Sequence, residues 1–243
     1  MLYLILSILI QVILIVHVIK TGRNQIWIWV LALLSLPGAI AYIVVELLPD
    51  VFRSRTAQRT ARGFKKAMDP TADLRRYENE ARVTGNVAAR QRYAEELTRQ
   101  ERYDDAIDQY RSALTGLYEH DPNLMLGLAR AQFGKGDATA ARTTLDELIR
   151  LNPDFRSPEG HLLYARSLET EGNIQKAIEE YSVLAGSYPG AEAAVRYAQL
   201  LKSQGRSDEA QKVARDLLEQ ARIAPAHYRR AQKSWLDAAQ RLA

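Results

Sequence analysis

The chain has 243 residues, of which 47% are hydrophobic, and it contains no cysteine. The length allows one domain of ordinary size beside a short apolar region, and the missing cysteine excludes disulfides and thiolate metal sites. The net charge of +4 comes from residues 51–70, where six Lys and Arg residues face a single Asp. Such a local excess gives no support to a nucleic-acid-binding domain, whose positive charge should lie on a folded face.

Two long apolar segments open the chain. Leu2–Ile19 has 18 residues and Ile26–Leu48 has 23. Because a helix needs about 20 apolar residues to cross a bilayer, we expect a transmembrane hairpin over residues 1–50, with helices at 2–19 and 26–48. A cleaved signal peptide is the alternative for the first segment, but no basic residue precedes it and no A-x-A-like site follows it.

The charges that flank these segments predict the orientation of the hairpin. The linker between them carries two basic residues, Lys20 and Arg23, whereas residues 51–69 carry six. The positive-inside rule therefore places the soluble part in the cytoplasm and the protein in the bacterial inner membrane as a multi-pass protein.

The second apolar segment has a recognisable layout, with Trp27 and Trp29 at its start, Pro37-Gly38 in its middle and Tyr42 later. This layout resembles the phospholipase D nuclease N-terminal domain, the membrane module that precedes the catalytic domains of bacterial cardiolipin synthases. The enzymes of that family use paired H-x-K-x-x-x-x-D motifs. None of the four histidines here has a lysine two residues later, so the resemblance implies a membrane module without phospholipase chemistry.

Residues 51–69 form a basic juxtamembrane linker with two interpretations. It is either an interfacial amphipathic helix that binds anionic lipid headgroups, or a solvated segment whose charges only fix the topology. The weak apolar face favours the second interpretation. The candidate headgroup-binding residues are Arg53, Arg55, Arg59, Arg62, Lys65 and Lys66.

A repeat of about 35 residues organises the rest of the chain. Gly-x-x-x-x-Ala steps end at Ala141, Ala177 and Ala210, and a copy with Glu101 in place of glycine ends at Ala106. Further positions recur in register. The position eight residues before each glycine holds Leu128, Tyr164 or Tyr197, and an alanine follows each of them. The position four residues after each repeat alanine holds Tyr110, Leu145, Tyr181 or Ala214. This is the period of a two-helix solenoid repeat.

Each recurring position has a structural role. The alanines allow the helices to approach closely, the large residue four places later fills the space between repeats, and the glycine ends the first helix with a positive φ. Asp121-Pro122 and Ser157-Pro158 pair a capping side chain with proline at the first helical position. In the first repeat, the second helix is expected to continue through Leu117 and Tyr118.

The spacing is similar to that of the tetratricopeptide repeat family. The expected fold is all-α: the transmembrane hairpin, then a helical repeat domain over residues 70–243. Within it we expect a helix that starts near Thr71 with Leu74 and Tyr77 inward. Four helix pairs follow, and then one C-terminal capping helix with Tyr228, Ala231, Trp235 and Leu242 inward. The pairs and the cap cover residues 87–122, 123–155, 158–190, 191–225 and 226–242.

The resemblance implies a binding groove along the first helix of each repeat. The residues just after the small-residue positions are expected to face it, and Arg130 and Arg166 would hold an acidic side chain or a terminal carboxylate. Alternatively, these arginines pair with neighbours such as Glu95, Glu169 or Asp154. The candidate partner-binding residues are Glu95, Arg99, Asn123, Arg130, Phe133, Arg166, Gln199 and Lys202.

The sequence offers no catalytic or metal-binding motif. It has no cysteine nucleophile, no H-E-x-x-H pair and no glycine-rich phosphate loop. We therefore expect a non-catalytic, cofactor-free membrane scaffold that binds a protein or peptide partner in its groove. The alternatives are a regulatory subunit of a phospholipid-synthesising membrane enzyme and a periplasmic scaffold for envelope assembly.

Overall fold

The structure of the chain is a computed structural model that describes residues 2–22, 24, 26–47, 69 and 71–243. It divides into two units, Met1–Ala72 and Asp73–Ala243. Every regular element of the described residues is helical. The basic linker lies almost entirely outside the described residues, and so do all six candidate headgroup-binding residues: Arg53, Arg55, Arg59, Arg62, Lys65 and Lys66.

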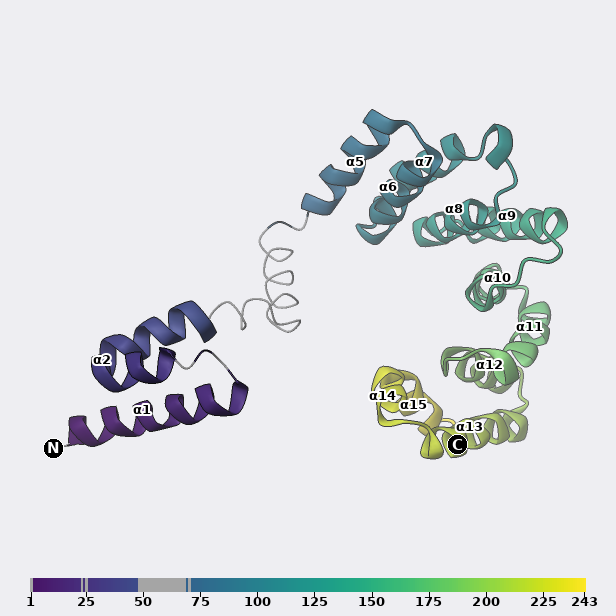
Figure 1. The fold of residues 1–243 in the computed structure, drawn as a ribbon. Coiled ribbons are helices and arrows are strands. Elements are labelled where there is room, and N and C mark those ends of the chain that lie inside the picture. Colours follow the sequence, from purple (N-terminus) through teal and green to yellow (C-terminus); the bar gives the residue numbers. More distant parts are fainter. Residues whose placement is uncertain (1, 23, 25, 48–68, 70) are drawn as a thin grey trace. The chain divides into compact units, whose positions relative to one another are not determined.

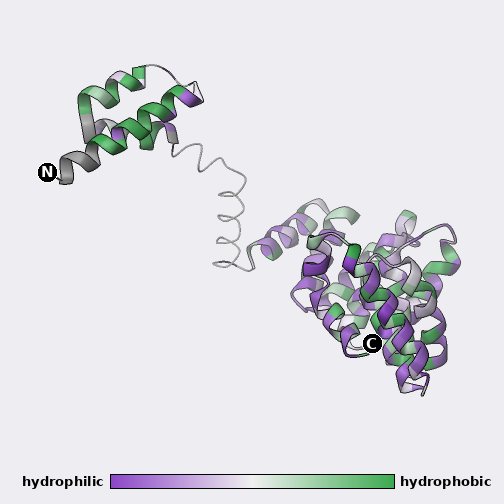
Figure 2. Ribbon diagram, turned by 90° about the horizontal axis from the view of Figure 1, so that it is seen from below, coloured by the Kyte–Doolittle hydropathy of each residue, from purple (hydrophilic) through white to green (hydrophobic). Residues whose placement is uncertain are grey.

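The first unit is a helical hairpin. Helix α1 (Leu2–Thr21) packs against α2 (Ile26–Tyr42), which continues into the π-helix η1 (Ile43–Leu47). The hairpin is strongly apolar along its length (Figure 2). The side chains that it buries are Leu14, Val18, Leu31, Ala39 and Tyr42.

Helix α2 bends back on itself. The ring centroids of Trp27 and Tyr42 lie 5.3 Å apart, although fifteen residues of straight helix would separate them by about 22 Å. A Cβ on Gly38 would lie only 2.5 Å from the carbonyl oxygen of Val30. Pro37 accounts for the bend, because proline lacks an N–H and its ring displaces the carbonyl one turn earlier.

The transmembrane interpretation of residues 1–50 is not supported. Among the helices of the described residues, none has both the length and the apolar character that a membrane span requires. The segment predicted as one span at 26–48 bends and changes to π-helical hydrogen bonding after Tyr42. The helices themselves and their antiparallel contact agree with the prediction.

The second unit is a solenoid of helix pairs arranged in an arc (Figure 1). The first helix of each pair lies on the inner side of the arc and the second on the outer side. Helix α5 (Ala72–Thr84) precedes them. The pairs are α6 (Val87–Arg99) with α7 (Tyr103–Ala113), α8 (Pro122–Lys135) with α9 (Ala138–Leu151), α10 (Pro158–Thr170) with α11 (Ile174–Ser187), and α12 (Glu192–Ser203) with α13 (Ser207–Ile223).

The predicted helix boundaries at the repeats are confirmed. The Asp121 carboxylate accepts hydrogen bonds from the N–H groups of Asn123 and Leu124, and the Ser157 hydroxyl accepts one from Gly160. These side chains satisfy N–H groups that have no partner within the helix. At the other helix ends, Gly136, Gly172 and Gly205 adopt φ values of 94°, 82° and 77°.

The repeat alanines form the centre of the solenoid. Ala106, Ala141, Ala177 and Ala210 are all buried, as are the repeat alanines of the first helices, Ala94, Ala129, Ala165 and Ala198. Close packing requires this, because a larger side chain would push the paired helices apart. Tyr110, Leu145 and Tyr181 are buried beside them, as predicted.

Helix α7 is shorter than predicted. Helix α7 ends at Ala113 rather than continuing through Leu117, because Thr115 is extended and Gly116 has a φ of 58°. A short 3₁₀ turn, η2 (Gly116–Tyr118), follows, and Leu117 is fully exposed.

The C-terminal cap consists of two short helices rather than the predicted single one. They are α14 (Ala226–Ala231) and α15 (Lys233–Gln240), which meet at Gln232. The side chain of Gln232 accepts a hydrogen bond from the N–H of Ala191, at 3.0 Å. Leu236 and Ala239 are buried against α12 and α13, whereas Ala231 is exposed.

The first helix of the second unit is short and packs through few residues. Helix α5 buries Leu74 in the same cluster as Leu97 and Ile107 of the first repeat. Tyr77 is half-buried, and the guanidinium of Arg76 lies over its ring at 4.7 Å. This placement agrees with a helix that covers the N-terminal end of the solenoid.

Candidate functional site

The inner side of the arc presents one residue from each repeat directly beside its buried alanine. Ala94, Ala129, Ala165 and Ala198 are completely buried, so the residue that follows each of them is turned toward the open surface of the same helix. Glu95, Arg130 and Gln199 are exposed and Arg166 is half-buried. We call this surface, formed by α6, α8, α10 and α12, the groove.

Three of the predicted residues lie together at one cavity of the groove. Glu95 comes from α6, and Asn123 and Arg130 come from α8, and all three line a cavity of about 370 Å³. Pro158 and Glu159 at the start of α10 form the opposite wall. A volume of this size lies within the range that holds a peptide side chain or a small ligand.

Tyr110 forms an apolar wall of this cavity. Its ring lies against Gly127, where an added Cβ would lie 2.4 Å from the ring. Burial and the negative charge of Glu95 raise the pKa of the Tyr110 hydroxyl to about 12. The phenol therefore stays neutral and acts as a packing surface with one polar end.

Arg130 and Arg166 differ in their surroundings. Arg130 makes no ion pair within the residues that the structure describes. The guanidinium of Arg166 lies over the ring of Phe133 at 4.8 Å, and its Nε is 3.7 Å from Oε1 of Glu192. The ion-pair partner of Arg166 is thus Glu192, and neither Glu95 nor Glu169 nor Asp154 pairs with it among the described contacts.

A charged network at the C-terminal end of the groove was not predicted from the sequence. Arg196 of α12 donates to Glu192 at 2.8 Å and to Glu169 at 3.2 Å, and its guanidinium lies 5.4 Å from the ring of Trp235. The Tyr181 hydroxyl also donates to Glu169, at 2.7 Å. The spacing of Glu192 and Arg196, four residues apart on one helix, was the available signal.

The remaining predicted residues do not line the cavity. Arg99 pairs with the buried carboxylate of Glu96 on its own helix. Gln199 and Lys202 are exposed on α12, and Phe133 serves as the surface on which Arg166 rests. The structure therefore gathers Glu95, Asn123 and Arg130 and leaves the others distributed along the groove.

No metal-binding site is seen in the described part of the chain. There, no three His, Asp or Glu side chains are placed to hold a metal ion. His161, the histidine nearest the groove residues, is 2.6 Å from a carboxylate oxygen of Glu180. The groove is therefore a surface of ion pairs, hydrogen-bonding groups and apolar side chains, which suits a polypeptide partner.

Comparisons with known proteins agree with this architecture. The sequence model of the tetratricopeptide repeat family matches residues 97–167. No curated protein sequence matches the chain. The comparisons do not support the resemblance of the first 50 residues to the phospholipase D nuclease N-terminal domain.

Solved structures of low sequence identity share the fold. The crystal structure of MamA has a TM-score of 0.55 at 21% identity, covering 65% of this chain and 93% of its own. PilF of Pseudomonas aeruginosa has a TM-score of 0.53 at 19% identity, covering 92% and 96%. YrrB, described as a TPR protein with an unusual peptide-binding site, has a TM-score of 0.50 at 16% identity, covering 65% and 82%. The second unit is thus a tetratricopeptide-type solenoid.

Proposed function

We propose that the protein is a non-catalytic scaffold that is attached to a membrane by its hairpin and binds a segment of a partner protein in its groove. The observation that carries the proposal is the exposed guanidinium of Arg130, without an ion pair in the described residues, at a cavity with Glu95 and Asn123. The peptide-binding site named for YrrB supports the use of this fold for such binding.

The groove provides the contacts that such a segment requires. The Arg130 guanidinium offers two parallel N–H donors to an acidic side chain or a terminal carboxylate. The Asn123 side chain offers both a donor and an acceptor to a peptide group. Arg166 and Phe133 continue this surface along α8 and α10 with a cation held over an aromatic ring.

The experiment that tests groove binding is crosslinking followed by purification of the full-length protein from its native cells. The double variant Arg130→Ala with Arg166→Ala should lose the captured partner, because both cationic contacts are removed. Helicity and melting temperature should change little, since Arg130 supports no ion pair of the described fold and the Arg166 pair is long.

The control for this experiment is Arg150→Ala on the outer helix α9, where Arg150 is exposed and pairs only at 3.7 Å with Glu147. It removes a similar charge away from the groove and should leave capture intact. Capture that survives the double variant would contradict the proposal, and an unfolded double variant would assign the arginines a structural role instead.

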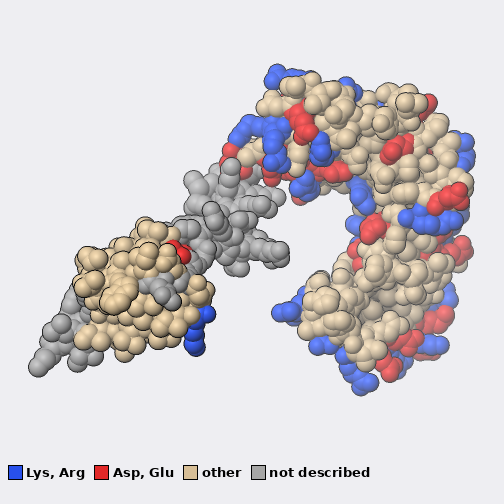
Figure 3. Space-filling view, in the orientation of Figure 1, with Lys and Arg blue, Asp and Glu red and all other residues tan. Residues whose placement is uncertain are grey.

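Membrane attachment is supported by the inverted polarity of the hairpin. Its polar groups pair inward: Gln11 Nε2 donates to the carbonyl oxygen of Leu31 at 2.8 Å, and His17 lies 3.0 Å from the Tyr42 hydroxyl. Many of the large apolar side chains outside its small buried core point outward, and Leu33 is 80% exposed and Trp29 70%. The side of the first unit seen in Figure 3 is almost free of charge. Such a surface is stable in lipid and unfavourable in water.

Cell fractionation tests the attachment. The full chain should remain with membranes after carbonate washing, and a chain beginning at residue 70 should not. A reporter fused after Ala243 tests the predicted cytoplasmic side. Retention of the partner by residues 70–243 alone would argue against regulation of a lipid-synthesising enzyme through the hairpin.

A further inference from the structure

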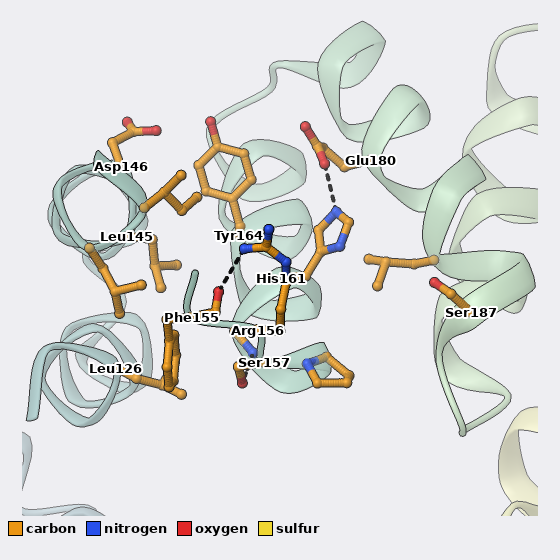
Figure 4. A pocket seen from close by; sticks show the side chains of 15 residues that line it. Leu126, Leu145, Asp146, Phe155, Arg156, Ser157, His161, Tyr164, Glu180 and Ser187 are labelled. Atoms are coloured by element: carbon orange, nitrogen blue, oxygen red, sulfur yellow. Dashed lines mark hydrogen bonds and ion pairs between the residues drawn. The ribbon is translucent and has the colours of Figure 1, made fainter. Parts of the chain in front are cut away.

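A second and larger cavity lies between α9, α10 and α11 (Figure 4). Its volume is about 550 Å³. The outer helices α9 and α11 supply two of its sides, whereas the groove cavity is lined mainly by α6 and α8. Five residues border both cavities: Leu126, Phe155, Arg156, Ser157 and Pro158. We call this cavity the inter-repeat pocket.

The pocket has an origin in the repeat sequence. Leu145 occupies the repeat position at which Tyr110 and Tyr181 stand in the first and third repeats, so a phenol ring is missing at this junction. Gly160 occupies the position of the buried Leu124. Accordingly, α9 packs less extensively against α10 than α7 against α8 or α11 against α12.

The inner part of the pocket is apolar. Leu145 and Leu148 of α9, Leu184 of α11 and the ring of Phe155 line this part. Apolar surface of this kind holds a ligand through the hydrophobic effect, because its contact with water is lost on binding.

The rim of the pocket is acidic. Asp146 on α9 and Glu180 on α11 lie on either side of Tyr164 (Figure 4). Burial and a hydrogen bond with Asp146 raise the pKa of the Tyr164 hydroxyl to about 12. The Asp146 carboxylate also pairs with Arg142 at 2.6 Å, and Glu180 pairs with His161 at 2.6 Å.

The rim has more acceptor capacity than donor capacity. Two carboxylates can accept about four hydrogen bonds each, and both retain unused positions. The lining holds two carboxylates, Asp146 and Glu180, against one guanidinium, Arg156, whose Nη1 donates to the carbonyl oxygens of Pro153 and Phe155. His161 Nε2 faces Glu180. The pocket therefore favours a cationic group at its rim and an apolar group inside.

We propose that the inter-repeat pocket is a second binding site, which takes a protein segment with a bulky apolar side chain next to a Lys or Arg. The apolar side chain enters between Leu145 and Leu184, and the cation pairs with Glu180. This site adjoins the groove cavity but is lined mainly by other helices, so one molecule binds two different segments, an acidic one in the groove and a basic one in the pocket.

The test uses the full-length protein in detergent and a fluorine-labelled dipeptide, acetyl-4-fluorophenylalanyl-lysine amide. Binding is followed by broadening of the ¹⁹F resonance of the peptide. The peptide with glutamate in place of lysine serves as the charge control. The lysine peptide should bind at least about fivefold more tightly than the glutamate peptide, as expected for a partly exposed ion pair.

Two variants connect the signal to the pocket. Leu145→Tyr restores the residue type of the neighbouring repeats and should lower the affinity for the lysine peptide about tenfold or more by filling the space. Ser182→Tyr adds the same ring to α11 at an exposed position outside the pocket lining and should change nothing.

A third variant, Glu180→Gln, keeps the size of the side chain and removes its charge, so the preference for the lysine peptide over the glutamate peptide should fall. This test does not depend on whether Leu145→Tyr folds. Absence of binding by the lysine peptide, equal binding of both peptides, or unchanged binding by folded Leu145→Tyr would each overturn the proposal.

Discussion

Glu101 has a backbone conformation that suits glycine. Its φ is 59°, whereas Gly136, Gly172 and Gly205 hold the equivalent place in the later repeats. A side chain with a Cβ is strained there by about 1 kcal/mol, because the Cβ approaches the next carbonyl oxygen. The first repeat tolerates this strain because Arg102, the next residue, still donates its N–H to the carbonyl of Leu97 at 2.9 Å.

Replacing Glu101 by glycine should therefore stabilise the repeat domain by about 1 kcal/mol. Urea denaturation of the two proteins measures the difference. The matched substitution Gly172→Ala should destabilise by a similar amount for the same steric reason. A loss of stability in Glu101→Gly would show that the Glu101 side chain contributes more than its backbone strain costs.

The buried tyrosines make stability dependent on alkaline pH. The pKa of Tyr110 is about 12 in the folded protein and near 10 in the unfolded chain. The unfolded chain releases this proton first, so the free energy of unfolding is unaffected below pH 10 and falls between pH 10 and 12, by about 1.4 kcal/mol per pH unit for this group. Burial and the Glu169 hydrogen bond raise the pKa of Tyr181 in the same direction.

Tyr110→Phe should make the loss of stability above pH 10 less steep than in the unaltered protein. Denaturation at about pH 9 and about pH 11 provides the comparison. The substitution also removes the hydrogen bond between the Tyr110 hydroxyl and Thr98, which should lower stability by about 1 kcal/mol already at neutral pH, so the slope with pH is the quantity to compare. An equally steep loss in both would assign the alkaline transition to other groups.

Residue-level prediction from sequence succeeded where a position repeats and failed where it does not. The alanines, the capping Asp121 and Ser157, and the left-handed glycines recur with a fixed period, and each has one structural role. The partner of Arg166 could not be identified in this way, because Glu192 belongs to the next repeat and several carboxylates lay at comparable separations in sequence.

At the scale of helices, the C-terminal cap covers the last helix pair in the way that the first helix of a further repeat would. Helix α15 places Leu236 and Ala239 against Val195 and Leu217. Without this cover, the apolar side of the last repeat would face water. The break at Gln232 was not visible in sequence, because Gln232 is an ordinary helix former whose side chain is used instead to accept from Ala191.

Leu236→Ala should lower the free energy of unfolding by about 2–4 kcal/mol, because a buried leucine is replaced by a cavity. Amide hydrogen exchange should become faster first in α13, which packs on α15. Leu242 offers a milder comparison, since it packs only at the edge of the same cluster. Protection unchanged in α13 would mean that the cap is independent of the last repeat.

The hairpin shows the limit of pattern reading at the same scale. A segment that is apolar on all sides has no polar face, so its periodicity cannot reveal that the helix bends back. Pro37 marked the position of the bend but not its size. The length of the apolar run therefore predicted one membrane span, whereas the helix bends so far that the rings of Trp27 and Tyr42 meet.

At the scale of the whole molecule, we propose two binding sites of different chemistry on the solenoid of a chain that also carries an apolar hairpin. The repeat period predicted the four helix pairs, because the same small and large residues recur about every 35 residues along the sequence. The inter-repeat pocket was not predicted, since it arises because Leu145 and Gly160 are smaller than the residues at the equivalent positions of other repeats. Partner identity depends on the groove, where the acidic ligand is expected at Arg130.

Photo-crosslinking from two positions of the full-length protein in its native cells tests the central claim most directly. A benzophenone side chain at Asn123, in the groove, should give one discrete protein adduct, and the same group at the exposed Thr143 of the outer helix α9 should give none. The Asn123 adduct should disappear when Arg130 and Arg166 are both alanine. No adduct from Asn123, or an equally strong adduct from Thr143, would contradict binding of a partner in the groove.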